Sequence, residues 1–301
     1  MSSRVASRIA PRTAAFRLLR PAPVPAPLAA SAVSWPLTSS PASRLPLSSP
    51  AGGDQPQPKA MVEDENGFGF IRRNTRDPKP RKKSVTEIRG PYYSVMGKRY
   101  LQDVLETMGH YVDGLKFAGG SFSLFPEKLK ELIDLAHQHD VYVSTGGWVE
   151  HVLTHASAST GFLSLPADDW LRLVERVQAA GLSAKPEIGV QFGAGGDTAA
   201  ANLSALGSQW TDPSRVMIES EGITKNVESW RTDVVQRVLR DLPMEKVMFE
   251  AADPAVFNWY VREIGTDVNL FVDHSQIVQW SALRAGIRGM AATFGKVASF
   301  R

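Results

Sequence analysis

The stretches Val216-Met217-Ile218-Glu219 and Val247-Met248-Phe249-Glu250 each run from three apolar residues directly into a glutamate. Two other short apolar segments, 184–190 and 270–274, also carry acidic side chains. Three of these segments are followed by a polar loop and a helical pattern, which is typical of a parallel βα repeat. Because the carboxyl ends of the strands gather on one face of such a fold, we expect these carboxylates to lie close together. Their mutual repulsion predicts a divalent cation, a lysine or both among them.

The same alternation of strands and helices extends from residue 84 almost to the end of the chain. Strands are predicted at 85–90, 111–117, 141–145, 184–191, 215–219, 246–250 and 268–273. Helical patterns occupy 98–108, 127–139, 149–153, 166–180, 199–206, 228–241, 254–264 and 275–285. These seven strands are one fewer than a (βα)8 TIM barrel requires, and the vacancy falls where a fourth strand is expected.

Two architectures fit this α/β pattern. One is an open or doubly wound sheet. The other is a (βα)8 TIM barrel that lacks the fourth strand and part of the preceding helix. The regular spacing on both sides of the vacancy favours the barrel.

The amino-terminal region has a different composition from the rest of the chain. Residues 1–53 contain six arginines, no lysine and no acidic residue, and they are rich in Ser, Ala and Pro. This composition predicts an organellar transit peptide, with a mitochondrial destination preferred over a plastid one; a plain tail on a cytoplasmic protein is the alternative. A basic linker is predicted at 54–83, a barrel domain at 84–292 and a tail at 293–301.

The overall composition excludes several classes of function. The net charge of +3 comes from the six arginines of residues 1–53, so the remainder carries about −3 and no nucleic-acid partner is expected. The chain has no cysteine, which excludes disulfides and thiolate metal sites. No apolar run approaches the ~18–20 residues of a membrane helix, so no membrane partner is expected.

Lys116 is the candidate for a catalytic lysine. It ends an otherwise apolar strand, where a lysine is costly unless it is paired or lies at a wet end. We therefore expect it to bind an anion or donate a proton; the alternative is an ion pair that closes a layer of the barrel. The glycines that follow two of the strands can offer bare amides to an anion. With Arg89, the predicted substrate-binding residues of this kind are Gly146, Gly147, Gly195 and Gly196.

The acidic set at the strand ends comprises Glu187, Glu219, Glu221, Glu250 and Asp273. Magnesium takes only one or two protein carboxylates and leaves room for substrate oxygens, so we assign Mg²⁺ to Glu219 and Glu250. Strand alternation places Glu219 and Glu221 on one face, with Ser220 on the other. Glu187 is expected to pair with Lys116 or Lys185 and to act with Lys116 in catalysis. Each carboxylate alone also fits an ordinary salt bridge.

The start of the last helix is a further candidate anion site. Ser275 is a plausible N-cap there, and helix starts after the last two strands often bind phosphate in barrels. Ser275 is therefore included among the substrate-binding residues. Arg284 and Arg288 can add positive charge near it, although exposed basic residues on a terminal helix are more often only solvated.

Five stretches within the predicted barrel form a specific set of motifs: Thr86-Glu87-Ile88-Arg89-Gly90-Pro91-Tyr92-Tyr93, Gly114-Leu115-Lys116-Phe117-Ala118-Gly119-Gly120-Ser121, Lys185-Pro186-Glu187-Ile188-Gly189, Val216-Met217-Ile218-Glu219 and Lys246-Val247-Met248-Phe249-Glu250-Ala251. This set resembles the phosphosulfolactate synthase family, which includes heat-stress-associated plant proteins, and the resemblance covers residues 84–292. Family members carry a longer segment before residues 161–166, with a strand and another acidic residue.

The resemblance implies a (βα)8 barrel and a magnesium-dependent addition of sulfite to phosphoenolpyruvate. Lys116 fits the lysine of the second strand in this family, and Glu187, Glu219 and Glu250 fit its acidic residues at later strand ends. The expected partners are therefore small anions, phosphoenolpyruvate and sulfite, with a homo-oligomer expected from the family alone. The alternative function is that of a non-catalytic stress protein that keeps the barrel and acts through protein contacts.

Overall fold

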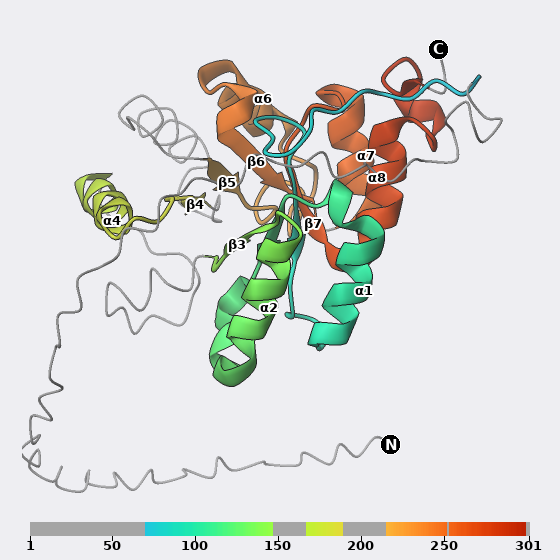
Figure 1. The fold of residues 1–301 in the computed structure, drawn as a ribbon. Helices are drawn as coiled ribbons and strands as arrows, with labels where there is room; N and C mark the ends of the chain where they lie inside the picture. Colours follow the sequence, from blue (N-terminus) through green and yellow to red (C-terminus); the bar gives the residue numbers. More distant parts are fainter. Residues whose placement is uncertain (1–69, 147–166, 189–214, 252, 299–301) are drawn as a thin grey trace, which may run out of the picture. The chain divides into compact units, whose positions relative to one another are not determined.

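A parallel sheet forms the centre of the computed structural model, which describes residues 70–146, 167–188, 215–251 and 253–298. Figure 1 labels strands β3 to β7, and its colours run from blue to red along the chain. The strands are β1 Thr86–Arg89, β2 Gly114–Lys116, β3 Tyr142–Ser144, β4 Glu187–Ile188, β5 Val216–Ile218, β6 Val247–Glu250 and β7 Leu270–Asp273. Each lies within a predicted strand segment, so the predicted alternation is confirmed for the part of the chain described.

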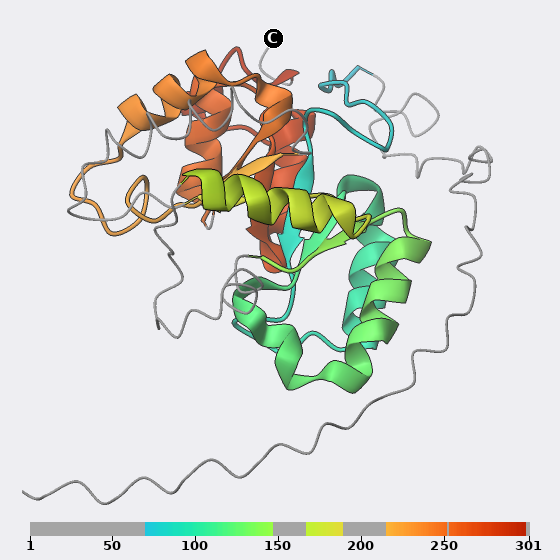
Figure 2. The ribbon, with the colours of Figure 1, turned by 90° about the vertical axis from the view of Figure 1, so that its left-hand side faces the viewer.

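The order of the strands decides between the two predicted architectures. The sheet runs β3-β2-β1-β7-β6-β5-β4, and every pair is parallel. A doubly wound sheet reverses direction at an inner strand, whereas here the first strand pairs with the last, as in a barrel. Figure 2 shows this junction, where the cyan β1 lies beside the red β7. The chain thus forms a curled, partial TIM barrel.

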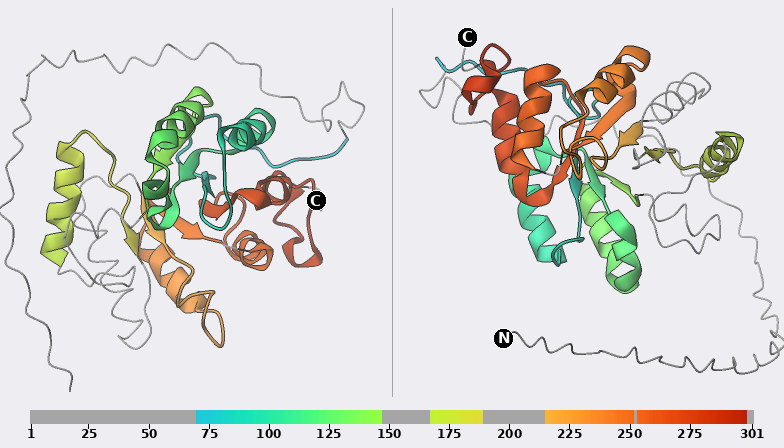
Figure 3. Two further views of the ribbon diagram at one scale, coloured as in Figure 1. Left: turned by 90° about the horizontal axis from the view of Figure 1, so that it is seen from below. Right: turned by 180° about the vertical axis from the view of Figure 1, so that it is seen from behind.

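The helices cover the outer face of the curled sheet. They are α1 Lys98–Met108, α2 Pro126–Gln138, α4 Ala167–Ala179, α6 Thr232–Asp241, α7 Pro254–Glu263 and α8 Ile277–Ala285. Short 3-10 helices lie at η2 Gly109–Tyr111, η3 Ala118–Leu124, η4 Met244–Lys246, η5 His274–Gln276 and η6 Ala291–Thr293. In the end-on view of Figure 3, helices α1, α2, α6, α7 and α8 surround the strands.

Strand alternation divides the buried apolar residues into two clusters. The large cluster joins outward-facing strand residues such as Ile88, Leu115 and Phe249 to the helices. The small one, Val85, Met217, Met248 and Phe271, lies on the inner face of the sheet. Because both faces are covered, polar residues at inner positions must find partners inside the barrel.

The sheet curls far enough to bring distant strands together across its interior. Four strands separate β2 from β4 in the sheet, yet Lys116 of β2 forms an ion pair with Glu187 of β4. Among the described residues, no strand lies between the edge strands β3 and β4 to close the barrel. The predicted position of the missing strand falls within residues 147–166, which are outside the described residues. The predicted helix 199–206 and the predicted transit peptide also lie outside the described residues.

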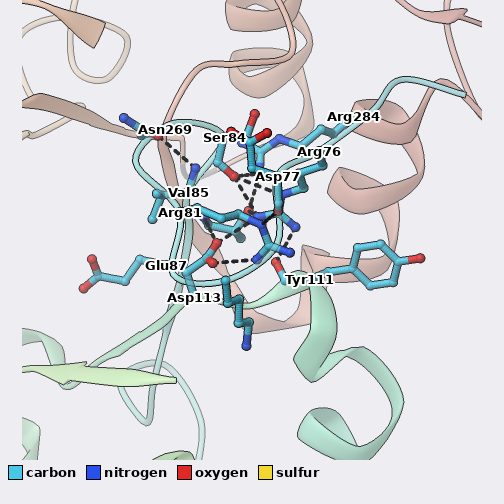
Figure 4. A network of polar contacts seen from close by, with 12 residues as sticks. Arg76, Asp77, Arg81, Ser84, Val85, Glu87, Tyr111, Asp113, Asn269 and Arg284 are labelled. Atoms are coloured by element: carbon cyan, nitrogen blue, oxygen red, sulfur yellow. Dashed lines mark hydrogen bonds and ion pairs between the residues drawn. The ribbon is translucent and has the colours of Figure 1, made fainter. Parts of the chain in front are cut away.

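Residues 70–84 lie against the amino-terminal ends of the strands. Arg76 and Arg81 bind Asp113, with N–O distances of 2.8 and 2.6 Å, and the Thr86 amide also donates to this carboxylate at 2.8 Å (Figure 4). Lys79 donates to three backbone oxygens, of Gly109, His139 and Asp140. This part of the predicted linker therefore belongs to the folded unit.

No helix in the described parts of the chain has both the length and the apolar character needed to cross a bilayer.

Candidate active site

The inner face at the carboxyl end of the barrel carries seven ionisable side chains. β1 supplies two of them because Glu87 and Arg89 alternate with Ile88, which faces the helices. The others come from the end of β2, the start of β4, the residue directly after β5, the end of β6 and the residue two before Glu187. The full set is Glu87, Arg89, Lys116, Lys185, Glu187, Glu219 and Glu250.

Three ion pairs connect these side chains. Lys116 pairs with Glu187, Lys185 with Glu87, and Arg89 with Glu250. The three cationic side chains are only 4–12% exposed, so water screens these pairs little. The predicted contact between Glu187 and Lys116 is present, and the proposed alternative partner, Lys185, binds Glu87 instead. Lys116 thus also forms an ion pair, which was the alternative to a catalytic role for this residue.

Glu219 is the fourth carboxylate and has no cation of its own in this cluster. Burial and then repulsion from Glu187 and Glu250 raise the pKa of Glu219 from an ordinary 4.5 to about 8. A hydrogen bond with Glu187 also favours the protonated form. At neutral pH the carboxyl group of Glu219 is therefore mainly protonated and neutral.

The two lysines respond differently to burial. Burial opposes the charge of Lys116, but Glu187 and Glu87 outweigh it and raise the pKa of Lys116 above its usual range. Burial lowers the pKa of Lys185, and Glu87 only partly offsets this effect. Burial alone would raise the pKa of Glu87, yet the two lysines hold it below its ordinary value. Lys116 therefore keeps its proton at neutral pH.

Glu250 is held by donors from β1 and from the residues that directly follow β5. Its Oε1 pairs with Arg89, and its Oε2 accepts from the amide and hydroxyl of Ser220 at 3.0 and 2.9 Å. Burial works against the charge, but Arg89 and Ser220 keep the pKa of Glu250 below its ordinary value. The expectation that Ser220 points away from this site is wrong, because β5 ends at Ile218 and strand alternation does not continue past that residue.

The remaining predicted acidic residues bind neighbours close to them in sequence. Both carboxylate oxygens of Glu221 accept from the Asn226 side chain, at 2.9 and 3.0 Å, so Glu221 does not share the face of Glu219. Asp273 caps η5 by accepting from the amide and hydroxyl of Ser275, at 3.0 and 2.6 Å. Asp273, and not the predicted Ser275, is thus the N-cap at this helix start.

The glycine predictions can be followed only for Gly146. Its φ of +66° is in the left-handed region, and a Cβ there would lie 2.9 Å from Cε of Lys116 and 3.6 Å from Glu187. Gly146 therefore lies directly against the Lys116–Glu187 pair. Gly147, Gly195 and Gly196 lie outside the described residues.

Arg284 lies at the opposite end of the barrel, so the suggestion that it adds charge near Ser275 is wrong. Its guanidinium donates to Ser84 O and Thr86 Oγ1, which belong to the start of β1, and to Val268 O. Helix α8 runs away from the carboxyl end of β7, so the last turn of α8, which contains Arg284, lies at the amino-terminal face of the barrel.

The donor set is compatible with a magnesium ion. Among the described residues, no group of three or more His, Asp or Glu side chains forms a metal site. A magnesium site would use fewer carboxylates, which is usual for this ion. Glu219 lies beside Glu187 and Glu250 and lacks a cation, and oxygen donors of this kind suit Mg²⁺.

Comparison with known proteins decides the family of this chain. A sequence profile of the (2R)-phospho-3-sulfolactate synthase family matches residues 74–290. The chain belongs to the phosphosulfolactate synthase family. One relative in this family is protein HEAT-STRESS-ASSOCIATED 32 of Arabidopsis thaliana, 36% identical over 71% of this chain and 90% of the plant protein. Another is the phosphosulfolactate synthase of Methanothermobacter thermautotrophicus, 26% identical over 77% of this chain and 99% of its own length.

The match to the plant family member also reveals a difference in length. It runs over 260 positions but takes up 71% of this chain of 301 residues, which is about 214 residues. The plant protein thus carries tens of residues within the matched region that this chain lacks. This difference is consistent with the strand predicted to be missing.

Several residues of this site are not among those predicted from the sequence. Glu87 is named only within a predicted strand and a family motif, although its alternation with Ile88 marks an inner position. Lys185 was considered only as a possible partner of Glu187. Ser144 and Tyr142, which both donate to Glu87, carry no charge and so gave no signal.

Proposed function

We propose that this protein catalyses the magnesium-dependent addition of sulfite to phosphoenolpyruvate, which gives phosphosulfolactate. The observation that carries the proposal is the convergence of Arg89, Lys116 and Lys185 with four carboxylates inside the barrel, at the end where barrel enzymes react. Both substrates are anions, so a site that concentrates buried cations offsets their repulsion. The relative from Methanothermobacter, named a phosphosulfolactate synthase, supports the same reaction.

The reaction adds sulfite and one proton across the carbon–carbon double bond of phosphoenolpyruvate. The sulfur lone pair forms a bond to the terminal carbon, C3. The π electrons move to C2 and spread onto the adjacent carboxylate. A proton then adds to C2, and no bond to phosphate breaks. The site must therefore stabilise negative charge on the carboxylate and deliver one proton to C2.

Lys116 is the proposed proton donor for C2. It stays protonated at neutral pH because Glu187 and Glu87 outweigh the effect of burial on its pKa. Glu187 orients the ammonium group through their ion pair, and Gly146 leaves room beside it. Mg²⁺ would be held by Glu219 and Glu250 and would supply a Lewis acid for the developing charge.

The test is an assay of the purified full-length protein for sulfite-dependent consumption of phosphoenolpyruvate, with Mg²⁺ or with EDTA. We expect turnover with Mg²⁺ and little with EDTA. We expect Lys116→Ala to lower kcat by about 10²-fold or more, as loss of general acid catalysis predicts. Lys130→Ala is the matched control, because the Lys130 side chain is 81% exposed and its ion pair with Asp134 lies on the surface of α2. Undiminished turnover by Lys116→Ala would refute the assigned role.

A second candidate function is that of a non-catalytic stress protein that acts through protein contacts. The 36% identity to protein HEAT-STRESS-ASSOCIATED 32 favours it. If the wild-type protein shows no sulfite-dependent turnover although it is folded, this second candidate replaces the first.

A further inference from the structure

The guanidinium group of Arg89 is surrounded by three aromatic rings. Its Cζ lies 4.9 Å from the ring centre of Phe271, 5.0 Å from that of Tyr93 and 5.7 Å from that of Tyr92. All three distances fall within the range of cation–π attraction. Phe271 is buried on the inner face of the barrel, whereas Tyr92 and Tyr93 are 51% and 67% exposed in the loop after β1.

The ring contacts engage the π faces and leave hydrogen-bond donors of Arg89 available. Arg89 is only 5% exposed, and its Nη2 donates to Glu250. Its Nε is buried and has no hydrogen-bond partner in the part of the chain that the structure describes. An unpaired buried donor is costly, so this N–H is suited to an acceptor brought by a ligand. A guanidinium recognises a carboxylate in a fixed, planar geometry.

Arg89 is also placed next to Lys116. The two residues are register partners on β1 and β2, and Nζ of Lys116 lies 4.6 Å from the same Phe271 ring. A carboxylate bound at Arg89 therefore lies beside the proposed proton donor. In phosphoenolpyruvate the carboxylate is attached to C2, the atom that receives the proton.

We propose that Arg89 is the carboxylate-binding residue of this site and that Tyr92 and Tyr93 are its positioning residues. This inference rests on the proposed function and deepens it. The rings fix the plane of the guanidinium, and the guanidinium in turn fixes the plane of the substrate carboxylate. That plane matters because the electrons displaced by sulfite reach the carboxylate only when it is conjugated with the double bond.

The loop holds the rings through a specific close approach. Tyr92 packs on Gly119, which has φ +60°, and a Cβ at Gly119 would lie 2.4 Å from Cε2 of the Tyr92 ring. Tyr92 and Tyr93 also contact each other edge to face, with ring centres 4.8 Å apart. The two tyrosines thus form one unit over Arg89, although both are largely exposed.

The test compares Tyr93→Ala, Tyr93→Phe and Val95→Ala. Val95 lies in the same loop, is 93% exposed and serves as the control. We expect Tyr93→Ala to raise KM for phosphoenolpyruvate about three- to tenfold, from the usual strength of cation–π contacts, with KM for sulfite and Tm unchanged. Tyr93→Phe keeps the ring and should behave as wild type. Equal changes for both substrates, or no change, would overturn the inference.

Calorimetric titration with oxalate separates this inference from the proposed reaction. Oxalate carries carboxylates but no phosphate, and methyl phosphate is the opposite probe. We expect Tyr93→Ala to weaken oxalate binding and leave methyl phosphate binding unchanged. If wild type does not turn over but binds oxalate in this Tyr93-dependent way, the reaction is wrong and the carboxylate site stands. If oxalate binding does not depend on Tyr93, or is absent, the carboxylate site is wrong.

Discussion

Replacing Asp113 by alanine is expected to destabilise the barrel more than any surface change. Asp113 is 6% exposed and accepts hydrogen bonds from Arg76, Arg81 and the Thr86 amide, at 2.8, 2.6 and 2.8 Å (Figure 4). The Arg81 side chain is 1% exposed. Burial lowers the pKa of Arg76 only to about 10, so this residue stays charged at neutral pH. The variant therefore leaves buried positive charge without a counterion.

The size of the effect follows from these contacts. Breaking a buried ion pair by removing one partner costs about 3–5 kcal/mol, and a buried N–H left without an acceptor costs about 1–3 kcal/mol. Because such losses are not additive, we expect Asp113→Ala to lower the free energy of unfolding by about 4–6 kcal/mol. This is a large share of the ~5–15 kcal/mol that stabilises a typical domain.

The assay is urea unfolding at pH 7, followed by tryptophan fluorescence. Asp113→Asn retains an acceptor for the Thr86 amide and should lose less stability than Asp113→Ala. Lys83→Ala is the control, because the Lys83–Asp267 pair is exposed, and we expect no measurable change. A loss below about 1.5 kcal/mol for Asp113→Ala, with an unchanged m value, would refute the reasoning.

Three further predictions concern the inner charge cluster. The pKa of Glu219 is about 8 in the folded protein and near 4.5 in the unfolded chain, so the free energy of unfolding falls as the pH rises between these values. Glu219→Gln should remove this pH dependence. In urea unfolding the variant should be more stable than wild type at pH 8 by on the order of a few kcal/mol, and equally stable at pH 4. Ser220→Ala removes the hydroxyl bond to Glu250 and should cost about 1–3 kcal/mol in the same assay; an unchanged midpoint would contradict the contact. Gly146→Ala forces a Cβ against Lys116 at a positive φ and should lower kcat/KM about tenfold in the sulfite assay, whereas wild-type kinetics would show that the pair tolerates displacement.

The fold was largely predictable because strand and helix patterns are local. Each described strand lies within its predicted segment. Glu219, which directly follows β5, and Glu250, which ends β6, are predicted to lie near Glu187, and they do. The partners of the inner charges were not predictable. Lys185 and Glu87, for example, are 98 residues apart and meet only because the sheet curls. On strands buried on both faces, the hydrophobic pattern does not distinguish the inner side from the outer.

The end of α8 was misjudged for a related reason. Arg284 and Ser275 belong to the same predicted helix, but a helix of nine residues carries its last turn to the other end of the barrel. Ser220 was assigned by extending strand alternation beyond Ile218, where the strand has already ended.

The pairing of β1 with β7 has a consequence for protein engineering. The amide of Asn74 donates to the carbonyl of Ala285 at 2.8 Å, so a segment near the start of the described region touches the end of α8. A circular permutant that joins the two ends of the described region and opens the chain between β3 and β4 would place every strand of the described sheet beside its neighbour in sequence. Its contact order would be lower, and it should refold faster than the natural arrangement.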